Sequence, residues 1–502
     1  RYIDQVLPSL GESDIVSTTV TGLLPGVEAT GADTPQAARI KGSPVWRTIA
    51  ANAVRNVLER PLDRPVSFTI DSSPVTLTPS HVEAAQQRAR RGGRPHNEAR
   101  ETYARILVEE LANQVAAHKE MALEDAGWIV DEVVSSREAR REINLRWLPS
   151  SPVQLLERLY ARPRLLAMCA PELSPEEIEA VSRPKGSPIT AADIPILDEL
   201  AECLGPFRTD FEKRQRAAAQ ARDAELSEYV KETMSSMNLG GGIVNLEQLT
   251  ERAAGSGPQS SLADRASADR TWTYGHIVVD EAQELSPMQW EMLARRCPTR
   301  SMTVVGDLDQ RPDGSPSGGW ASILGRLGSS ARIENLTVSY RTPATILRSA
   351  GRTLAAAGVS VLPVEAARDL PDCLAFTAIE ADGREGAVVR SVKERRAWLD
   401  GEYGPGEGTL AVIVPSDLRE GIAEALAGEP GLAEYVKADS AGLARIGVLS
   451  AIEAKGLEYD AVVLVEPSRV LAEGPGNLYV AMTRPTRRLD VLYSGELPAG
   501  MA

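Results

Sequence analysis

Apolar and polar positions along the chain predict a helical first half and a second half in which strands and helices alternate. Within 99–115 the apolar residues recur every three or four positions, which predicts one buried face of a helix: Ala99, Tyr103, Ile106, Leu107, Leu111 and Val115. The segments VSFTI (66–70) and VTLT (75–78) predict a short hairpin. We therefore expect helices over most of 44–212, and a further short helix at Tyr2–Leu7.

From residue 276 onward the pattern changes to short apolar runs that alternate with amphipathic stretches. The expected strands are 276–280, 302–306, 408–415, 445–450 and 460–465, and the expected helices are 287–296, 343–356 and 416–427. Such alternation is typical of parallel sheets with helical crossovers. The sequence therefore predicts an α/β fold class, joined to the helical first half.

Residues 214–272 fit neither pattern. The stretches NLGGG, GSGPQSS and SLADRASADR are rich in Gly and Ser and carry few apolar residues. Sequence of this kind cannot easily support a core, so a long exposed loop is expected.

Composition narrows the class of protein. A chain of 502 residues predicts about three domains. No apolar run approaches the roughly 20 residues of a membrane span, and four scattered cysteines without a CxxC indicate neither zinc nor disulfides. No signal peptide is apparent and the chain begins at Arg1, so we expect a fragment of a cytoplasmic protein that binds no membrane.

The net charge of −15 limits the expected partners. A protein that coats nucleic acid is usually basic, so a nucleic-acid contact is expected to be local. An acidic surface fits a basic cleft of another protein, but it could equally serve only solubility.

Two strands are expected to end in acidic and amide side chains. The run His276–Val279 leads into Asp280 and Glu281, and Ser286-Pro287 then predicts a helix start. MTVVGDLDQ (302–310) repeats this design with Asp307 and Gln310. Because ligands bind where parallel strands end, the two stretches predict one polar crevice.

The phosphate-binding loop that such acids usually accompany is not found. The chain contains no Gly-x-x-x-x-Gly-Lys-Ser/Thr and no Gly-Lys dipeptide.

The motifs in the second half allow a resemblance to be stated. DEAQ and GDxxQ resemble motifs II and III of superfamily 1 helicases of the UvrD type. LTVSYRTP (336–343) resembles motif IV, EAKGLEYD (453–460) resembles motif V, and LYVAMTRPTRRL (478–489) resembles motif VI. Together these motifs cover about 271–502.

The resemblance implies ATP and Mg²⁺ as cofactors and an ATP hydrolase activity in the full-length protein. It places Asp280 on Mg²⁺ and makes Glu281 the base that orients and deprotonates water. Gln283 and Gln310 would sense the γ-phosphate.

The same resemblance brings residues from the later motifs to the nucleotide. Arg341 and Arg484 would be arginine fingers, unless they are ordinary surface ion-pair partners. Tyr340 would stack on the adenine, Glu458 would contact the ribose or γ-phosphate side, and Gly456 would also bind the nucleotide.

The resemblance also implies two RecA-like parallel-sheet domains, the first incomplete, with a mostly helical insertion domain. The expected boundaries are 1–30 (remnant of the first RecA-like domain), 31–213 (helical insertion), 214–270 (flexible loop), 271–335 (motifs II and III) and 336–502 (second RecA-like domain). The phosphate loop is expected upstream of Arg1, so this chain alone is expected to be inactive.

Two segments of the helical part resemble the HelD branch, bacterial proteins that bind RNA polymerase: WLPSSPVQLLERLY and TAADIPILDELAECLG. The resemblance implies an ATP-dependent factor that binds core RNA polymerase and helps to release nucleic acid or recycle stalled complexes. The acidic run Asp223, Glu225, Glu228 and Glu232 with the loop after it would then enter a basic channel, unless the loop is an idle linker.

Two departures and two alternatives accompany this interpretation. Ile452 stands where motif V often has His, which puts duplex unwinding in doubt, and Trp320 could stack on a base or belong to the core. The alternatives are a UvrD/Rep-type DNA-unwinding repair helicase and a non-catalytic polymerase-binding protein.

Overall fold

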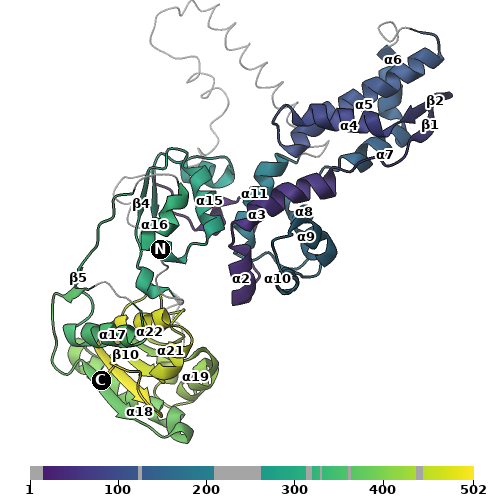
Figure 1. The fold of residues 1–502 in the computed structure, drawn as a ribbon. Helices are drawn as coiled ribbons and strands as arrows, with labels where there is room; N and C mark the ends of the chain where they lie inside the picture. Colours follow the sequence, from purple (N-terminus) through teal and green to yellow (C-terminus); the bar gives the residue numbers. More distant parts are fainter. Residues whose placement is uncertain are drawn as a thin grey trace, which may run out of the picture. The chain divides into compact units, whose positions relative to one another are not determined.

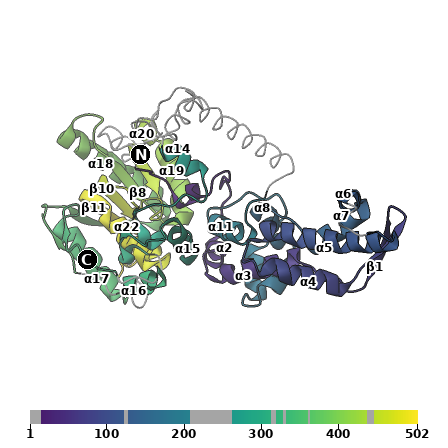
Figure 2. The ribbon, with the colours of Figure 1, turned by 90° about the horizontal axis from the view of Figure 1, so that it is seen from above.

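The computed structural model describes residues 15–121, 127–207, 262–311, 319–327, 331–359, 363–436 and 445–502. The chain divides into two compact units (Figures 1 and 2). A helical unit comprises Arg1–Tyr274 and Ser286–Pro298, and a sheet unit comprises Gly275–Leu285 and Thr299–Ala502. No helix in the described ranges is both long enough and apolar enough to cross a membrane.

The helical unit contains two separate cores. The first is formed by α2 (Pro35–Lys41), α3 (Val45–Ala53), α8 (Pro152–Tyr160), α9 (Pro163–Cys169), α10 (Pro175–Val181), α11 (Asp193–Leu204) and α15 (Pro287–Arg296), with the helical turns Val20–Leu23 and Val54–Leu58. The second is formed by α4 (Pro79–Arg90), α5 (His96–His118), α6 (Gly127–Ser135) and α7 (Arg137–Arg146), which pack on the hairpin β1 (Val66–Ile70) and β2 (Ser73–Leu77).

The second core confirms the predicted helix and hairpin. The side chains of Ala99, Tyr103, Leu107, Leu111 and Val115 are all buried along one face of α5, and Ile106 packs at its edge. Strands β1 and β2 pair antiparallel, with Val66 opposite Leu77. The spacing of apolar residues was sufficient here because each element buries one face against the others.

Helix α11 is buried around nearly its whole circumference, charged residues included. Its Asp198 is fully buried, and its two carboxylate oxygens lie 2.6 Å from guanidinium nitrogens of Arg295 and Arg296 on α15. Burial alone would lower the pKa of Arg295, but Asp198 and Glu199 outweigh burial and raise it. Ion pairs between buried charges therefore hold α11 against α15.

The sheet unit is built on a five-stranded parallel sheet in the order β7-β11-β10-β8-β9. Its strands are β7 (Leu374–Ala378), β8 (Leu410–Ile413), β9 (Ile446–Leu449), β10 (Tyr459–Val465) and β11 (Pro485–Tyr493). Ala411 and Ile413 face a core with α17 (Ala344–Ala356), α21 (Pro467–Ala472) and α22 (Pro475–Thr483). Leu410 and Val412 face a core with α18 (Arg384–Tyr403) and α19 (Arg419–Ala427). The predicted α/β class is confirmed, and a sheet covered on both faces is consistent with a RecA-like domain.

Two smaller parallel pairs complete the unit. Strand β3 (Ile277–Val279) pairs with β4 (Met302–Val304), and β5 (Val338–Ser339) pairs with β6 (Glu365–Ala366). The short helices α16 (Gly319–Leu324) and α20 (Ala433–Val436) and several helical turns lie between the strands. All five predicted strands of the second half are present, although most are shorter than predicted.

The structure differs from the prediction at the end of the expected loop. Leu262–Ala268 forms a helix, α14, and Ala266 in it is buried. This stretch contains three alanines, which favour helix once one side has something to pack against. The rest of that loop up to residue 261, its acidic run, and the expected helix at Tyr2–Leu7 lie outside the described residues.

Candidate active site

The two acids predicted at the end of β3 lie in a tight turn. The Asp280 carboxylate accepts a hydrogen bond of 2.9 Å from the backbone N–H of Glu281. Glu281 itself has a φ of 48°, in the left-handed region that residues with side chains seldom adopt. Backbone strain of this kind is concentrated at functional sites. The Ala282 N–H bonds the Val305 carbonyl at 3.0 Å, which ties the turn to the end of β4.

Gln283 connects the acids of β3 to those that follow β4. Its amide nitrogen donates to the Glu281 carboxylate at 2.5 Å, and its amide oxygen accepts from the Asp307 backbone N–H at 3.1 Å. A Cβ at position 306 would lie 2.5 Å from the Gln283 oxygen, so any side chain there would displace this amide. The two motifs therefore meet as the sequence predicted.

Gln310 lies in the same cluster. Its amide nitrogen donates to the Asp307 carboxylate at 3.0 Å, while its amide oxygen is buried and has no hydrogen-bond partner in the described part of the chain. A buried acceptor without a partner is costly unless something else donates to it. Asp307 was missing from the predicted site residues, although its place directly after the second strand was the available signal.

Motif V approaches the acids from the five-stranded sheet. Gly456 has a φ of +70°, and a Cβ at this position would lie 3.7 Å from Oε1 of Glu281. Its neighbour Leu457 offers a backbone carbonyl to the Arg484 guanidinium at 3.3 Å. The sheet unit therefore brings Glu281, Gly456 and Arg484 to one place.

Arg484 is deeply buried for a charged residue, with 2% of its surface exposed. Its guanidinium donates to the carbonyls of Val480 and Leu457. Burial and the nearby Arg341 lower the pKa of Arg484, whereas the carboxylates of Glu281, Glu458 and Asp307 oppose that shift. Arg484 is a largely desolvated cation near the carboxylates of the site, not a surface ion-pair partner.

The other predicted residues lie near the surface. Arg341 forms an ion pair with Glu458, and the two side chains are 38% and 50% exposed. Tyr340 is 77% exposed, so the face of its ring is open to a ligand. Its role with adenine remains a prediction.

Trp320 lies in α16 with its ring against Gly306, where a Cβ would come within 2.9 Å of the ring. It is partly buried in this position. The structure thus places Trp320 beside the motif III turn, as a packing contact.

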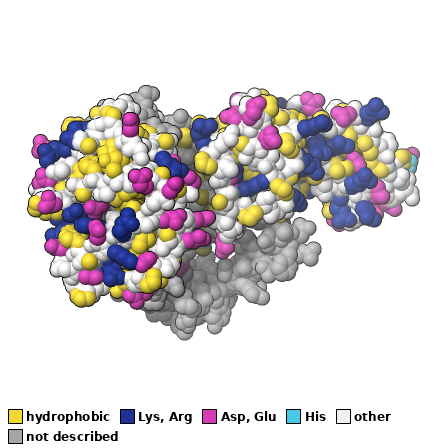
Figure 3. Space-filling model, turned by 90° about the horizontal axis from the view of Figure 1, so that it is seen from below, with side chains coloured by type: hydrophobic (Ala, Val, Ile, Leu, Met, Phe, Trp, Pro, Cys, Tyr) yellow, Lys and Arg dark blue, Asp and Glu magenta, His cyan; other side chains and the backbone are white. Residues whose placement is uncertain are grey.

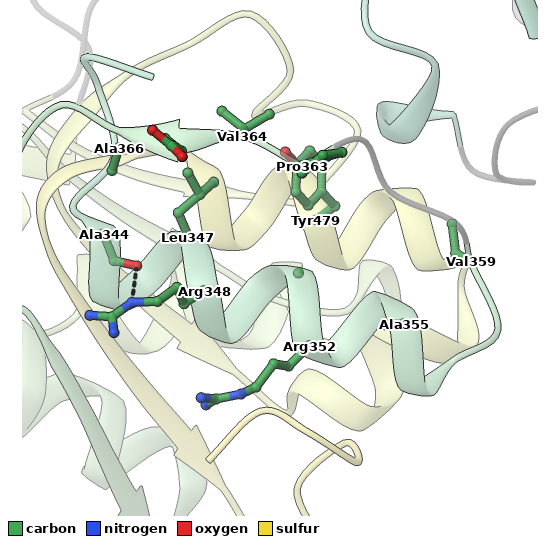
Figure 4. Close-up of a pocket in the computed structure, with 12 residues that line it drawn as sticks. Ala344, Leu347, Arg348, Arg352, Ala355, Val359, Pro363, Val364, Ala366 and Tyr479 are labelled. Atoms are coloured by element: carbon green, nitrogen blue, oxygen red, sulfur yellow. Dashed lines mark hydrogen bonds between the residues drawn. The ribbon is translucent and has the colours of Figure 1, made fainter. Parts of the chain in front are cut away.

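One cavity of about 700 Å³ lies beside α17 (Figure 4). Leu347 points from the helix toward β6, which carries Ala366; Val364 precedes this strand, and Tyr479 contributes to the wall. Burial, with the carboxylates of Asp307 and Asp309, raises the pKa of Tyr479. Tyr479 therefore lines the cavity and also lies near the acids of motif III. None of the predicted site residues lines this cavity.

Asp280 could supply one of the ligands of a Mg²⁺ ion. It is an exposed carboxylate, and no group of three or more metal-binding side chains occurs among the described residues. Mg²⁺ at nucleotide sites is usually held by one or two carboxylates, with water and phosphate oxygens as the remaining ligands. A single carboxylate therefore fits a metal that arrives with a nucleotide.

Two solved structures of viral helicases and one bacterial domain are similar to parts of the chain. The C-terminal domain of a possible DNA helicase from Lactobacillus plantarum WCFS1 is 25% identical, with a TM-score of 0.24, over 33% of this chain and 92% of that one. The PRRSV helicase is 13% identical, with a TM-score of 0.24, over 43% of this chain and 34% of that one. The arterivirus nonstructural protein 10 helicase is 15% identical, with a TM-score of 0.25, over 44% of this chain and 39% of that one.

A comparison with curated proteins finds no match. The family comparison does find one, and it includes both acid-bearing turns. Residues 173–311, which run from the helical unit through DEAQ and GDLDQ, match the UvrD/REP helicase N-terminal domain, and this segment is similar to that domain.

Proposed function

We propose that the full-length protein hydrolyses ATP at the site formed by the turns after β3 and β4 and by motifs V and VI. The observation that carries the proposal is the convergence of Glu281, Gln283, Gly456 and Arg484 in one unit of the structure. Helicases similar to residues 173–311 generally use ATP and Mg²⁺.

Each residue has a chemical task in this proposal. Glu281 accepts the proton of the attacking water, and Gln283 fixes its carboxylate through the 2.5 Å hydrogen bond. The unpartnered amide oxygen of Gln310 accepts a hydrogen bond from a water at the γ-phosphate. Asp280 would hold Mg²⁺, which neutralises charge on the β- and γ-phosphates.

The cations act on the transferring phosphoryl group. Arg484 lies in a low-dielectric setting, where a positive charge interacts more strongly than in water. Arg341 is partly exposed and would leave Glu458 for the nucleotide. Once Arg341 has moved, Glu458 is free to contact the ribose.

We further propose that the motor serves a HelD-like factor that binds core RNA polymerase and helps to release nucleic acid. Support comes from the sequence of the two HelD-like segments, which form the core helices α8 and α11. Helix α11 is joined by buried ion pairs to α15, which begins three residues after Glu284. A partner bound to the helical unit would thereby act on an element next to the acids in the sequence.

A DNA-unwinding helicase is the second candidate. The match of residues 173–311 to the UvrD/REP model favours it, and Lys and Arg side chains gather on one face of the helical unit (Figure 3). A local contact with nucleic acid is compatible with either function. A non-catalytic polymerase-binding protein is the third candidate, which the ATPase measurement separates from the other two.

The decisive experiment replaces the proposed base. In the full-length protein, Glu281→Gln should reduce ATP turnover by about 10²-fold or more, because the proton acceptor is lost while the charge of Asp280 remains. Binding of a fluorescent ATP analogue should change little. The matched control is Glu334→Gln, since Glu334 is an exposed carboxylate paired with Arg332 on the surface. Turnover in the Glu281→Gln protein that equals the control would refute the proposed function.

A further inference from the structure

Lys455 of motif V contacts the turn that carries the acids. Its ammonium group lies 2.5 Å from the carboxylate of Glu284, at the end of the helical turn Ala282–Glu284. The Lys455 side chain is only 11% exposed, whereas Glu284 is 47% exposed. A lysine side chain that is largely buried has few other positions for its ammonium group, so we expect this pair to have a defined geometry.

The pair joins two turns that each have hydrogen bonds of their own. The Glu284 backbone N–H bonds the Glu281 carbonyl at 2.9 Å, so Glu284 is rigidly connected to the proposed base. On the other side, Glu453 accepts from the Ser450 N–H at 2.8 Å, and Leu457 accepts from Arg484. Lys455 lies between these two anchors, next to Gly456.

The position of Gly456 shows what the pair controls. A Cβ there would lie at van der Waals distance, 3.7 Å, from Oε1 of Glu281. The peptide of Gly456 therefore closes one side of the space around the carboxylate. If the turns separated, Glu281 would lose this wall, and its carboxylate could leave the orientation that Gln283 gives it.

We propose that Lys455 and Glu284 are positioning residues, which hold motif V against the acidic turn and so fix the Glu281 carboxylate for catalysis. This inference rests on the proposed ATP hydrolysis. Neither side chain needs to touch the nucleotide, because each acts through Glu281 and Gly456.

The test removes the pair in steps in the full-length protein. Lys455→Met keeps the length of the side chain and loses its charge, and Glu284→Gln keeps its shape and loses its charge. Each should lower kcat about 10-fold, which corresponds to about 1.4 kcal/mol, with KM for ATP changed less than about threefold. Lys455→Arg, which keeps the charge, should stay within about threefold of the native kcat. The exchanged pair Glu284→Lys with Lys455→Glu should recover part of the loss.

A matched pair elsewhere in the sheet unit controls for loss of charge. Lys393 forms an ion pair with Glu429 and is 48% exposed, and Lys393→Met should leave kcat unchanged. Affinity for a fluorescent ATP analogue, measured at equilibrium, should be the same in all variants. These two measurements separate positioning from a direct contact with the nucleotide.

Three outcomes would overturn the inference: native kcat in Lys455→Met, a rise in KM or weaker analogue binding without a fall in kcat, or Lys455→Arg as impaired as Lys455→Met. The last outcome also covers a fold that collapses on any change at this position. The Glu281→Gln variant tests the proposed ATP hydrolysis separately from the positioning role of Lys455. If Glu281→Gln is inactive and Lys455→Met is normal, only the positioning role is wrong.

Discussion

Arg341 and Arg484 share a proposed role but lie in different surroundings. Arg341 is 38% exposed and pairs with an exposed carboxylate, and such pairs contribute about 1 kcal/mol or less to stability. Arg341→Ala should therefore lower ATP turnover by about 10³-fold or more while the melting temperature stays nearly unchanged. Arg484→Ala should lower both, because the Leu457 carbonyl loses the donor that Arg484 provides and a large buried side chain is removed.

Steady-state ATPase assays and thermal melts of the full-length protein check this prediction. Arg469→Ala is the control, since Arg469 forms an exposed ion pair with Asp417 in the same unit. Hydrolysis by Arg341→Ala at the native rate would show that Arg341 only holds Glu458. Equal melting temperatures for native protein and Arg484→Ala would contradict the structural part.

Sequence could predict that several residues of the candidate site lie together, but not all of their contacts. DEAQ and GDLDQ directed attention to Glu281, Gln283 and Gln310, which the structure brings together. The ion pair of Lys455 with Glu284 joins residues 171 positions apart, so no local pattern announces it. The left-handed backbone of Glu281 is equally hidden, because glutamate carries no preference for it.

Elements were predictable where burial leaves a continuous or periodic apolar pattern. Strands β8 and β10 are short apolar runs covered on both faces, and both were expected. Strand β11 was not expected, because Arg487, Arg488 and Asp490 interrupt its apolar run. Asp490 forms ion pairs with Arg395 and Arg488, and burial still raises its pKa. The charged residues of β11 are paired only in the folded structure, so the sequence pattern did not reveal this interior strand.

A buried charge is expected to contribute to the stability of the helical unit. Asp193 begins α11, and its carboxylate is fully buried between Lys41 at 2.9 Å and Arg183 at 2.5 Å. It also accepts from Thr190 and Tyr160. Asp193→Asn should cost about 3–5 kcal/mol of the free energy of unfolding at pH 7, because Lys41 and Arg183 lose their shared partner.

The effect of Asp193 should depend on pH. Burial alone would raise the pKa of Asp193, but Lys41, Arg183 and hydrogen bonds from Thr190 outweigh burial and hold it below its usual value. The stabilisation is therefore complete above about pH 4, near the unfolded value, and is lost as the pH falls through the lower folded value. Urea denaturation at pH 7, 5 and 3 should show the difference between native protein and Asp193→Asn shrinking only in the acidic step.

The control for this measurement is Asp71→Asn. Asp71 is 43% exposed and pairs with Lys119, so its loss should cost about 1 kcal/mol or less at every pH. A cost for Asp193→Asn no larger than that of Asp71→Asn would show that the buried network contributes nothing to stability.

At the scale of the whole molecule, the segments before and after the acidic turn in the sequence both belong to the helical unit. The chain passes between the two units after Tyr274, after Leu285 and after Pro298. Residues 275–285, which carry Asp280 and Glu281, therefore have segments of the helical unit on both sides. A partner that binds the helical unit is connected to the proposed ATPase site through two peptide links.

The net charge indicates which partner to test first. At −15 the chain is poorly suited to coat nucleic acid, whereas an acidic surface is attracted to a basic cleft. The full-length protein should retain nuclease-treated core RNA polymerase on an affinity column. Retention should weaken as salt rises above about 0.1 M, because exposed charges are then screened within about 10 Å.

Without polymerase the protein should unwind a tailed DNA duplex poorly, and the Glu281→Gln protein serves as the ATPase-dead control in that assay. Efficient unwinding by the protein alone, together with no retention of polymerase, would establish the DNA-unwinding alternative instead.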